Sequence, residues 1–334
     1  MVIRPKPGKA SPRFLYHFLT SRGITDSLQH AAESRSGTFP QITFDQVAEL
    51  ELPCLALDEQ RLIEEVFDAL ADKIDQNRRT ARTLERLVQA TFRAWFVDFE
   101  PVKAKAAGAT AFPSMPQPVF DALPTRFVDS AIGPVPEGWE VTAIGDVVTA
   151  KGGGTPSTKN ADYWEGGEHC WATPKDMSRL AHPVLLDTDR RITDEGVNAI
   201  SSGVLPIGTV LMSSRAPVGY LAVAAVSTAI NQGFIAMVCD GPLPPTYVIN
   251  WAFASMDAIK ARASGTTFPE ISKKAFRSLP VVVPTVDMIA AYQRAADPLF
   301  DLLTACVKES EQLGATRDYL LPKLLSGTVQ VAPP

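Results

Sequence analysis

Residues 264–284 read SGTTFPEISKKAFRSLPVVVP, and residues 36–53 read SGTFPQITFDQVAELELP. Both stretches run Ser-Gly-Thr, Phe-Pro, Gln or Glu and then Ile, and both continue as an apolar, strand-like run that ends at proline. Phe268 lies 229 residues after Phe39. A period this long excludes a solenoid, whose units are about 20 to 50 residues long. The two copies therefore indicate a duplicated domain.

A long helix is expected after each copy. In residues 57–96 apolar side chains recur at heptad spacing, which is typical of a seam between two helices. The residues expected in this seam are Phe67, Leu70, Ile74, Asn77, Leu84 and Val88. Asn77 is the polar member, and a buried polar residue in such a seam can fix its register.

Residues 286–325 show the same spacing with a weaker seam, in which we expect Leu299, Leu303, Leu313 and Leu320. Pro298 should kink this helix. An antiparallel pair of the two helices is the preferred interpretation, because both carry apolar stripes that the small flanking segments could not cover. The alternative is that each helix packs on its own domain.

Between the helices, residues 101–136 are rich in Pro, Ala and Gly and are predicted to be a linker. Residues 137–284 then alternate short apolar runs, such as DVVTA, VLPIGTVLMSS, GYLAVAAVS and GFIAMVCD, with turn signals. This pattern predicts a mixed, mainly β domain that ends in a helix at YVINWAFASMDAIKARA. The predicted fold class is α+β, with long antiparallel paired helices.

Composition narrows the class of protein. The chain has 334 residues and a net charge of −5, which argues against nonspecific coating of nucleic acid but leaves room for a local basic face. It has no apolar run of about 18 residues and no secretory h-region, so we expect a cytoplasmic protein without a membrane span. The four cysteines, Cys54, Cys170, Cys239 and Cys306, are too scattered for a disulfide framework or a zinc site.

Seven phrases in order, from FRAWFVDFEPV through PEGWEVTAIGDV, GGGTPSTKNADYWEGGEHCWATPKDMS, GTVLMSSRAPVGYLAVA, NQGFIAMV and SGTTFPEISKKAFRSLPVVVP to YLLPKLLSGTV, resemble the specificity subunit of Type I restriction-modification systems. The resemblance covers essentially the whole chain. It implies a target recognition domain followed by a long helix, occurring twice, with antiparallel helices and domains that grip two separated DNA half-sites.

The resemblance suggests boundaries for five parts. We expect the end of a first target recognition domain at 1–56, a first spacer helix at 57–100, the linker at 101–136, a complete second target recognition domain at 137–284, and a second spacer helix with a tail at 285–334. Aligning Phe14 with Tyr247 and Phe18 with Trp251 places Met1 inside the first recognition domain. Its front portion is then expected to be missing, through a truncated start, a degraded gene or a functioning short form.

Enzyme motifs are not evident. LPPT at residues 243–246 lacks the polar and aromatic members of an adenine methyltransferase loop, and KGGGTPST at residues 151–158 lacks the lysine of a phosphate-binding loop. His17, His30, His169 and His182 are interpreted as structural. We expect a DNA-recognition subunit with no cofactor of its own, with S-adenosylmethionine, ATP and Mg on partner subunits.

The resemblance implies double-stranded DNA, Type I methyltransferase (modification) subunits and, through them, restriction/translocase subunits as partners; a homodimer stays open. The alternative function is a truncated remnant that acts as a helical scaffold with one working DNA-reading domain.

Candidate DNA contacts are sought by residue type, because base edges and phosphates are bound by Arg, Lys, Asn, Gln, Ser and Thr. The candidates are Lys151, Thr155, Ser157, Thr158, Lys159, Asn160, Lys175, Ser213, Ser214, Arg215, Asn231 and Gln232. The structural alternatives are a surface turn for residues 151–160, an ion pair for Arg215 and a hydrogen-bonded turn for residues 231–233. Tyr163, Trp164 and Trp171 are predicted to be core residues rather than platforms for base stacking.

Residues 73–93 are also basic, with Lys73, Arg78, Arg79, Arg82, Arg86 and Arg93 against Asp75 and Glu85. A solvated helix face explains such a run in most proteins. In the family that the chain resembles, the spacer helices also carry methyltransferase subunits, so a partner or DNA-spacer role is the alternative.

Overall fold

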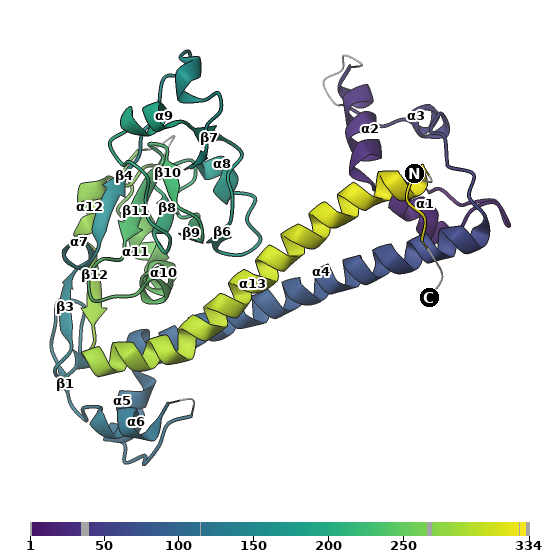
Figure 1. Cartoon of the computed structure of the whole chain (residues 1–334). Helices are drawn as coiled ribbons and strands as arrows, with labels where there is room; N and C mark the ends of the chain where they lie inside the picture. The colour runs from purple at the N-terminus through teal and green to yellow at the C-terminus, as the bar shows by residue number, and fades with distance from the viewer. Residues whose placement is uncertain (1, 35–39, 114, 266–268, 327, 332–334) are drawn as a thin grey trace. The chain divides into compact units, whose positions relative to one another are not determined.

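The structure is a computed structural model of the chain and describes residues 2–34, 40–113, 115–265, 269–326 and 328–331 (Figure 1). It contains two compact units, each described separately below. The first unit is Met1–Thr80 with Cys306–Pro334, and the second unit is Ala81–Ala305. None of the helices in these described ranges is long and apolar enough to cross a membrane.

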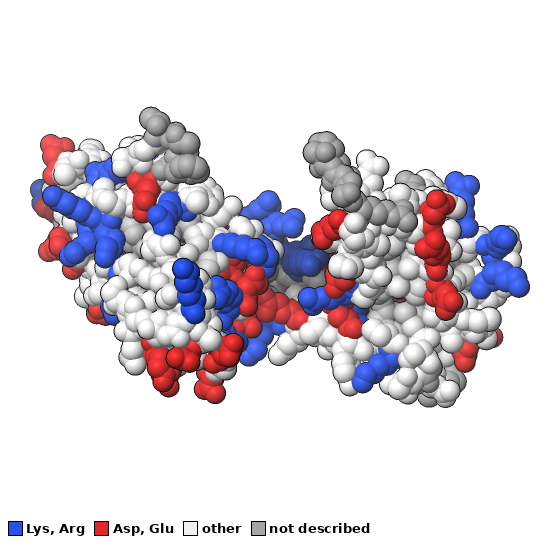
Figure 2. Space-filling model, turned by 90° about the horizontal axis from the view of Figure 1, so that it is seen from above, with Lys and Arg blue, Asp and Glu red and all other residues white. Residues whose placement is uncertain are grey.

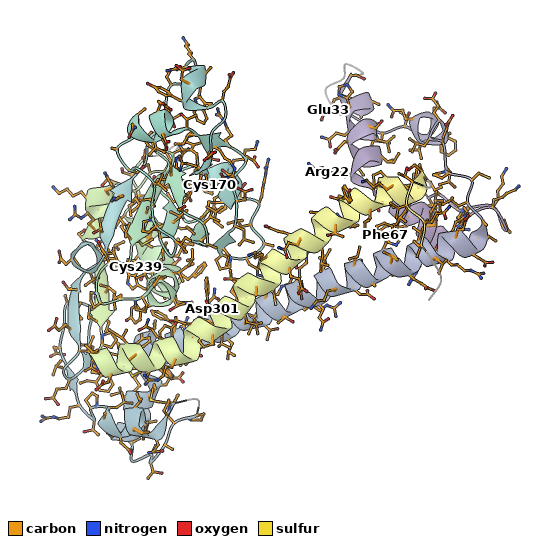
Figure 3. The ribbon with its side chains drawn as sticks, in the orientation of Figure 1. Arg22, Glu33, Phe67, Cys170, Cys239 and Asp301 are labelled. Atoms are coloured by element: carbon orange, nitrogen blue, oxygen red, sulfur yellow. The ribbon has the colours of Figure 1, made fainter. Side chains whose placement is uncertain are left out.

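The first unit holds α1 (Pro12–Leu19), α2 (Arg22–Ser34), α3 (Phe44–Ala48), the start of α4 (Leu57–Phe92) and the end of α13 (Val286–Leu325). Its core contains Phe67 of α4 (Figure 3). Phe67 is clustered there with Phe14 of α1 and with Leu321 and Leu324 of α13. Farther along α4, the Asn77 amide donates to the Glu309 carboxylate over 2.8 Å. Because residue numbers fall along α4 as they rise along α13, the two helices are antiparallel.

The paired helices confirm the predicted fold class. The structure buries Phe67, Ile74, Asn77, Leu84, Val88 and Leu303, and it leaves Leu70, Leu299, Leu313 and Leu320 half-buried. Asn77 is satisfied by Glu309 rather than by a second seam amide. Pro298 lies inside α13, which continues on both sides of it.

The core of the second unit includes side chains from the end of α4 and from the start of α13. Phe92 lies edge-on to Tyr247 and Tyr292, with ring centroids 4.9 and 6.0 Å away. Trp95, in the π-helical turn η1 (Arg93–Val97), is 1% exposed. These aromatic rings fix α4 and α13 to α10 (Pro245–Ala254) of the same unit.

The expected linker is folded instead. It contains α5 (Glu100–Ala106), α6 (Gln117–Ala122), β1 (Phe127–Val128) and β2 (Val135–Pro136). Val102, Phe120 and Val135 are each at most 2% exposed and join the core of the second unit. The prediction was wrong because the buried apolar residues of this segment are widely spaced among prolines and glycines. Such spacing gives neither a helical nor a strand period.

The described part of the second unit contains four small sheets. The five-stranded sheet has the order β4 (Thr149–Gly152), β11 (Phe234–Val238), β8 (Val210–Ser213), β9 (Leu221–Ala224) and β6 (Val184–Leu185), and it is antiparallel except for the β6–β9 pair. A three-stranded sheet orders β10 (Thr228–Ile230), β5 (His169–Ala172) and β7 (Arg191–Ile192). β12 (Pro280–Val283) pairs with β3 (Glu140–Ala143), and β1 pairs with β2.

Short helices connect these strands: α7 (Ile144–Val147), the 3-10 turn η2 (Ala161–Tyr163), α8 (Pro174–Met177), α9 (Asp194–Asn198), α11 (Met256–Ala261) and α12 (Lys273–Arg277). Most of the predicted apolar runs are strands, and the closing helix is α10 followed by α11. DVVTA differs, because α7 takes its first residues and β4 begins only at Thr149.

The duplication is visible in the helices. Phe14 of α1 and Tyr247 of α10 are both buried, and α3 and α12 are five-residue helices capped by the hydroxyls of Thr43 and Ser272. Much of the Ser-Gly-Thr-Phe part of the two copies, residues 36–39 and 266–268, lies outside the described residues. Residues 50–53 were expected to form an exit strand like β12, but the described part of the first unit has no strand that could pair with them as β3 pairs with β12.

Candidate nucleic-acid interface

Five strand ends from the two larger sheets of the second unit meet at one edge. Gly152 at the end of β4 faces Ile235 near the start of β11, and Ser213 at the end of β8 faces Phe234. β5 and β10 are parallel, so Ala172 and Ile230 also end together, and residues 231–233 join β10 to β11. The segments that leave this edge are residues 153–160, 173–175, 214–220 and 231–233. We call these four segments the loop edge.

Backbone and side-chain hydrogen bonds tie the loop edge together. The Gly154 amide donates to the Ile230 carbonyl over 3.0 Å, and the Ser214 amide donates to the Gly233 carbonyl over 2.8 Å. The Thr155 hydroxyl donates to the Gln232 side chain. Candidates that are up to 77 residues apart in the sequence therefore share one surface.

Gly153 allows the closest of these approaches. A Cβ atom at this position would lie 2.0 Å from the Ile230 carbonyl oxygen and 2.2 Å from that of Asn231. Both atoms belong to the backbone, so neither can move aside as a flexible side chain would. The glycine run is thus required by packing between loops, in addition to any approach to a ligand.

Two tryptophans form hydrogen bonds with the backbone of the loop at residues 153–160. The Trp171 indole donates to the Gly154 carbonyl and the Trp164 indole to the Ser157 carbonyl, each over 3.1 Å. The guanidinium of Arg190 lies 3.5 Å from the centre of the Trp164 ring, at cation–π distance. Trp164 is therefore covered rather than open for base stacking.

Most of the predicted polar contacts face solvent. Lys151, Thr155, Ser157, Thr158, Lys159, Lys175 and Gln232 are exposed, and Asn160 and Asn231 are half-buried. Within the described residues no carboxylate lies at ion-pair distance from Lys151 or Lys159. Asn160 caps η2 through the Asp162 amide, and Asn231 accepts from the Gly233 amide over 2.8 Å. These two amides form turns, which was the structural alternative.

Ser213 and Ser214 do not face solvent, in contrast to the expectation that they contact DNA. Ser213 is 0% exposed, and its hydroxyl donates to the Pro217 carbonyl and accepts from the Tyr220 amide. Ser214 is 3% exposed, and its carbonyl accepts from the Ile271 amide. Both serines shape the loop that carries Arg215.

Arg215 is the outward-facing member of that group. Its side chain is 38% exposed, and its guanidinium lies 3.7 Å from the Glu270 carboxylate, which is 48% exposed. The two residues also form a backbone bridge. At this distance and exposure the ion pair is weak, so the guanidinium can exchange Glu270 for another acceptor.

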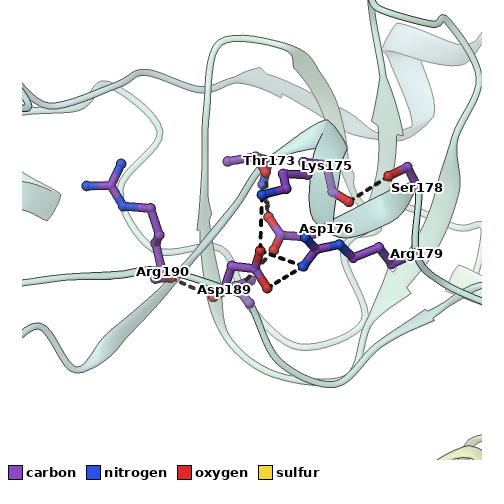
Figure 4. Close-up of polar contacts among 8 residues, drawn as sticks. Thr173, Lys175, Asp176, Ser178, Arg179, Asp189 and Arg190 are labelled. Atoms are coloured by element: carbon purple, nitrogen blue, oxygen red, sulfur yellow. Dashed lines mark hydrogen bonds and ion pairs between the residues drawn. The ribbon is translucent and has the colours of Figure 1, made fainter. Parts of the chain in front are cut away.

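A compact network surrounds Lys175 (Figure 4). Thr173 and Asp176 form a capping box at α8, and the second Asp176 oxygen accepts from the Asp189 amide over 2.9 Å. The Asp189 carboxylate lies 2.6 Å from Arg179 and 3.9 Å from Lys175. One carboxylate thus faces two cations.

Several relevant residues were missed by sequence reasoning. Lys273 is exposed on α12, and its Nζ lies beside Gly152 at the loop edge. The SKK triplet within the repeated stretch was the available signal. Carboxylate partners were also missed for three histidines: His17 lies 3.1 Å from Asp68, His169 lies 2.7 Å from Asp194, and His182 lies 3.1 Å from Glu85. Such pairs depend on tertiary structure.

Comparison with known proteins gives consistent matches. The family model of the Type I restriction modification DNA specificity domain matches residues 1–86 and 136–308. The HindI specificity subunit of Haemophilus influenzae, a Type I restriction enzyme subunit, is 28% identical over 98% of this chain and 80% of that protein. The MjaIX specificity subunit of Methanocaldococcus jannaschii is 32% identical over 57% of this chain and 44% of that protein.

A solved structure matches at the level of the fold. The S subunit of the Type I restriction-modification system of M. genitalium has a TM-score of 0.57 and 16% sequence identity. The match covers 96% of this chain and 74% of that chain.

Proposed function

This chain belongs to the family of the Type I restriction modification DNA specificity domain, and we propose that it reads one half of a bipartite DNA site beside methyltransferase subunits. DNA sequence recognition within a restriction-modification complex is its role, and it is a non-catalytic subunit of that complex. DNA and subunits of the complex are its partners.

The observation that carries the proposal is the convergence of the loop edge. Amides, hydroxyls and lysines from four separate segments share one surface of the second unit. This is the set of groups that binds base edges and phosphates. Base contacts are assigned to Gln232 and Arg215, and phosphate contacts to Lys151, Lys159 and Lys175.

The helices suggest where individual partner subunits bind, and the missing sequence motifs suggest which cofactors those subunits carry. Leu87 of α4 and Leu302 of α13 are 49% and 50% exposed, which suits docking of methyltransferase (modification) subunits. Restriction/translocase subunits then join through them. S-adenosylmethionine, ATP and Mg are assigned to these partners, because the chain's own loops lack the corresponding motifs. The cytoplasm is the assigned location.

One observation favours a second candidate function. The described part of the first unit holds helices but no strand, whereas the described part of the second unit holds four small sheets. A protein of this kind could serve as a helical scaffold with a single DNA-reading domain. A homodimer would instead present two such domains.

A gel shift with methyltransferase subunits distinguishes these two candidate functions. The full chain would be mixed with the subunits and with a bipartite duplex or a scrambled duplex. We expect a shift that needs both proteins and prefers the bipartite duplex. Copurification of the subunits without preference for either duplex would support the scaffold and contradict sequence reading.

A further inference from the structure

A row of cations leads from the loop edge to α4 within the second unit. α8 begins at Pro174, which lies against Gly233 of the loop edge. Lys175 on α8 and Arg179 just beyond it are 70% and 54% exposed. Asp189 faces both, so one positive charge remains after the two cations and one carboxylate are counted.

His182, in the segment after α8, contacts α4. It is 9% exposed, and its Nδ1 lies 3.1 Å from one Glu85 oxygen. The Gln89 amide donates to the other Glu85 oxygen over 3.4 Å. Both oxygens of Glu85 are therefore engaged, and the contact fixes the segment after α8 against the helix.

Arg82 and Arg86 lie on one side of this contact. On an α-helix they lie about 60° and about 100° around the axis from Glu85, on the side away from the seam residues Ala81 and Val88. Both arginines are exposed, and within the described residues neither has an ion-pair partner. Their charge is left for an anion outside the chain.

The surrounding surface does not share this character. Figure 2 shows Lys and Arg interspersed with Asp and Glu rather than a face of one sign, in keeping with the net charge of −5. A polyanion would therefore be held by local groups. Lys175 and Arg179 lie next to the loop edge, and the contact between His182 and Glu85 places the segment that follows them against the part of α4 that carries Arg82 and Arg86.

We propose that Lys175, Arg179, Arg82 and Arg86 form a phosphate-binding track for double-stranded DNA, running from the bases read at the loop edge onto the spacer beside α4. Duplex DNA carries one charge per about 1.7 Å of its axis, so a row of separate cations can contact successive phosphates. The inference rests on the DNA-recognition role and adds a sequence-independent contact outside the half-site. Phosphate contacts of this kind fix register and orientation without reading bases.

The test measures binding of the full chain, together with methyltransferase subunits, to a fluorescent duplex by anisotropy at several salt concentrations. Arg82→Gln combined with Arg86→Gln should lower the slope of log affinity against log salt by about 1.8, because each lost phosphate contact removes about 0.9. Specific and scrambled duplexes should lose affinity by the same factor. The matched control is Lys103→Gln combined with Lys308→Gln, which removes two exposed charges outside the track and should leave the slope unchanged.

A second measurement uses DNA length. A duplex that ends at the half-site cannot reach Arg82 and Arg86, so the arginine variant and the wild type should bind it equally. Thermal melting of each variant shows whether it is folded. An unchanged salt slope in the arginine variant, or an equal loss in the lysine control, overturns the track.

Other outcomes distinguish failure of the phosphate-binding track from failure of DNA sequence recognition. If the arginine variant keeps its salt slope but loses methyltransferase subunits, the surface binds protein, which also overturns the proposal. If the wild-type complex does not discriminate the specific from the scrambled duplex, the proposed recognition of a half-site is wrong. The salt slope of the arginine variant still tests the phosphate-binding track in that case.

Discussion

At the scale of single residues, the loop edge combines groups that were recognisable by type with contacts that were not. Lysines and amides in loops between short strands were predictable, because those residue types bind DNA. The burial of Ser213 and the pairing of Arg215 with Glu270 depend on which strands are neighbours. Sequence position does not reveal this, because the five-stranded sheet places β11 between β4 and β8.

Arg215 and Glu270 should act as a pair. Arg215→Ala should remove discrimination at one base pair, costing about 1 to 3 kcal/mol there if the guanidinium is bidentate to guanine. Glu270→Ala should weaken discrimination at the same base pair and strengthen binding to all sequences, because an acidic group leaves the interface. In the double variant the Glu270 change should have no further effect on discrimination, as expected for coupled residues.

Competition binding against duplexes substituted at each position measures this coupling. Lys159→Ala is the control, since losing a phosphate contact should lower affinity for every sequence and make the salt slope shallower by about 0.9. Additive effects of Arg215→Ala and Glu270→Ala on discrimination would contradict a positioning role for Glu270.

Thiol reactivity reports the packing around the sheets. Burial raises the pKa of the Cys239 thiol to about 12, and the neighbouring Asp240 contributes. Burial likewise raises the pKa of Cys170 on β5 (Figure 3), whereas Cys54 is exposed. Because the thiolate is the nucleophile, iodoacetamide near pH 8 should label Cys54 first and should leave Cys239 and Cys170 largely unlabelled.

Mass spectrometry of the native protein over time gives the order of labelling. In denaturant all four cysteines should react, which provides the control. Labelling of Cys239 as fast as Cys54 in native protein would show that the edge of the sheet beside β11 opens readily.

At the scale of elements, the helices were the most predictable part and the folded linker the least. Long heptad-like stretches carry a strong signal, so both α4 and α13 were expected close to their observed bounds. The detailed seam drifts, because an α-helix has 3.6 rather than 3.5 residues per turn. Leu321 is consequently 4% exposed, while Leu320, the heptad position, is half-buried.

The contact between Asn77 and Glu309 should make stability depend on pH. The Asn77 hydrogen bond, with help from Lys73, holds the pKa of Glu309 below its ordinary 4.5. A carboxyl whose pKa is lowered by folding adds stability above its unfolded pKa and loses it as pH falls through the folded pKa. Wild type should therefore exceed Glu309→Gln in stability near neutral pH, and the difference should shrink only below pH 4.5.

Urea unfolding midpoints at a series of pH values measure this difference. Glu65→Gln is the matched control and should show no such trend, because Glu65 is an exposed carboxylate on α4 that forms no ion pair within the described residues. A gap between wild type and Glu309→Gln that stays constant through pH 4 would contradict the assigned role of the contact.

At the scale of the whole molecule, the duplicated stretch is explained by two similar exits into two spacer helices. α3 and α12 repeat the same capped turn, yet the sheet that accompanies α12 has no counterpart among the described residues of the first unit. The exit strand fails to form there for a physical reason: a strand needs a neighbour for its backbone hydrogen bonds, and β3 supplies one only to β12.

This asymmetry predicts that one half-site carries the base discrimination. The reconstituted complex would be tested on two duplex series, one randomised in each half-site, at several salt concentrations. Substitutions in the half-site bound by the second unit should cost about 1 to 3 kcal/mol per base pair, because base-reading groups are left unpaired. Substitutions in the other half-site should change affinity little, since the described part of the first unit has no loops between strands that could reach base edges. Equal discrimination in both halves would contradict the single reader and would mean that two chains each present a complete recognition domain, or that another polypeptide completes the first unit.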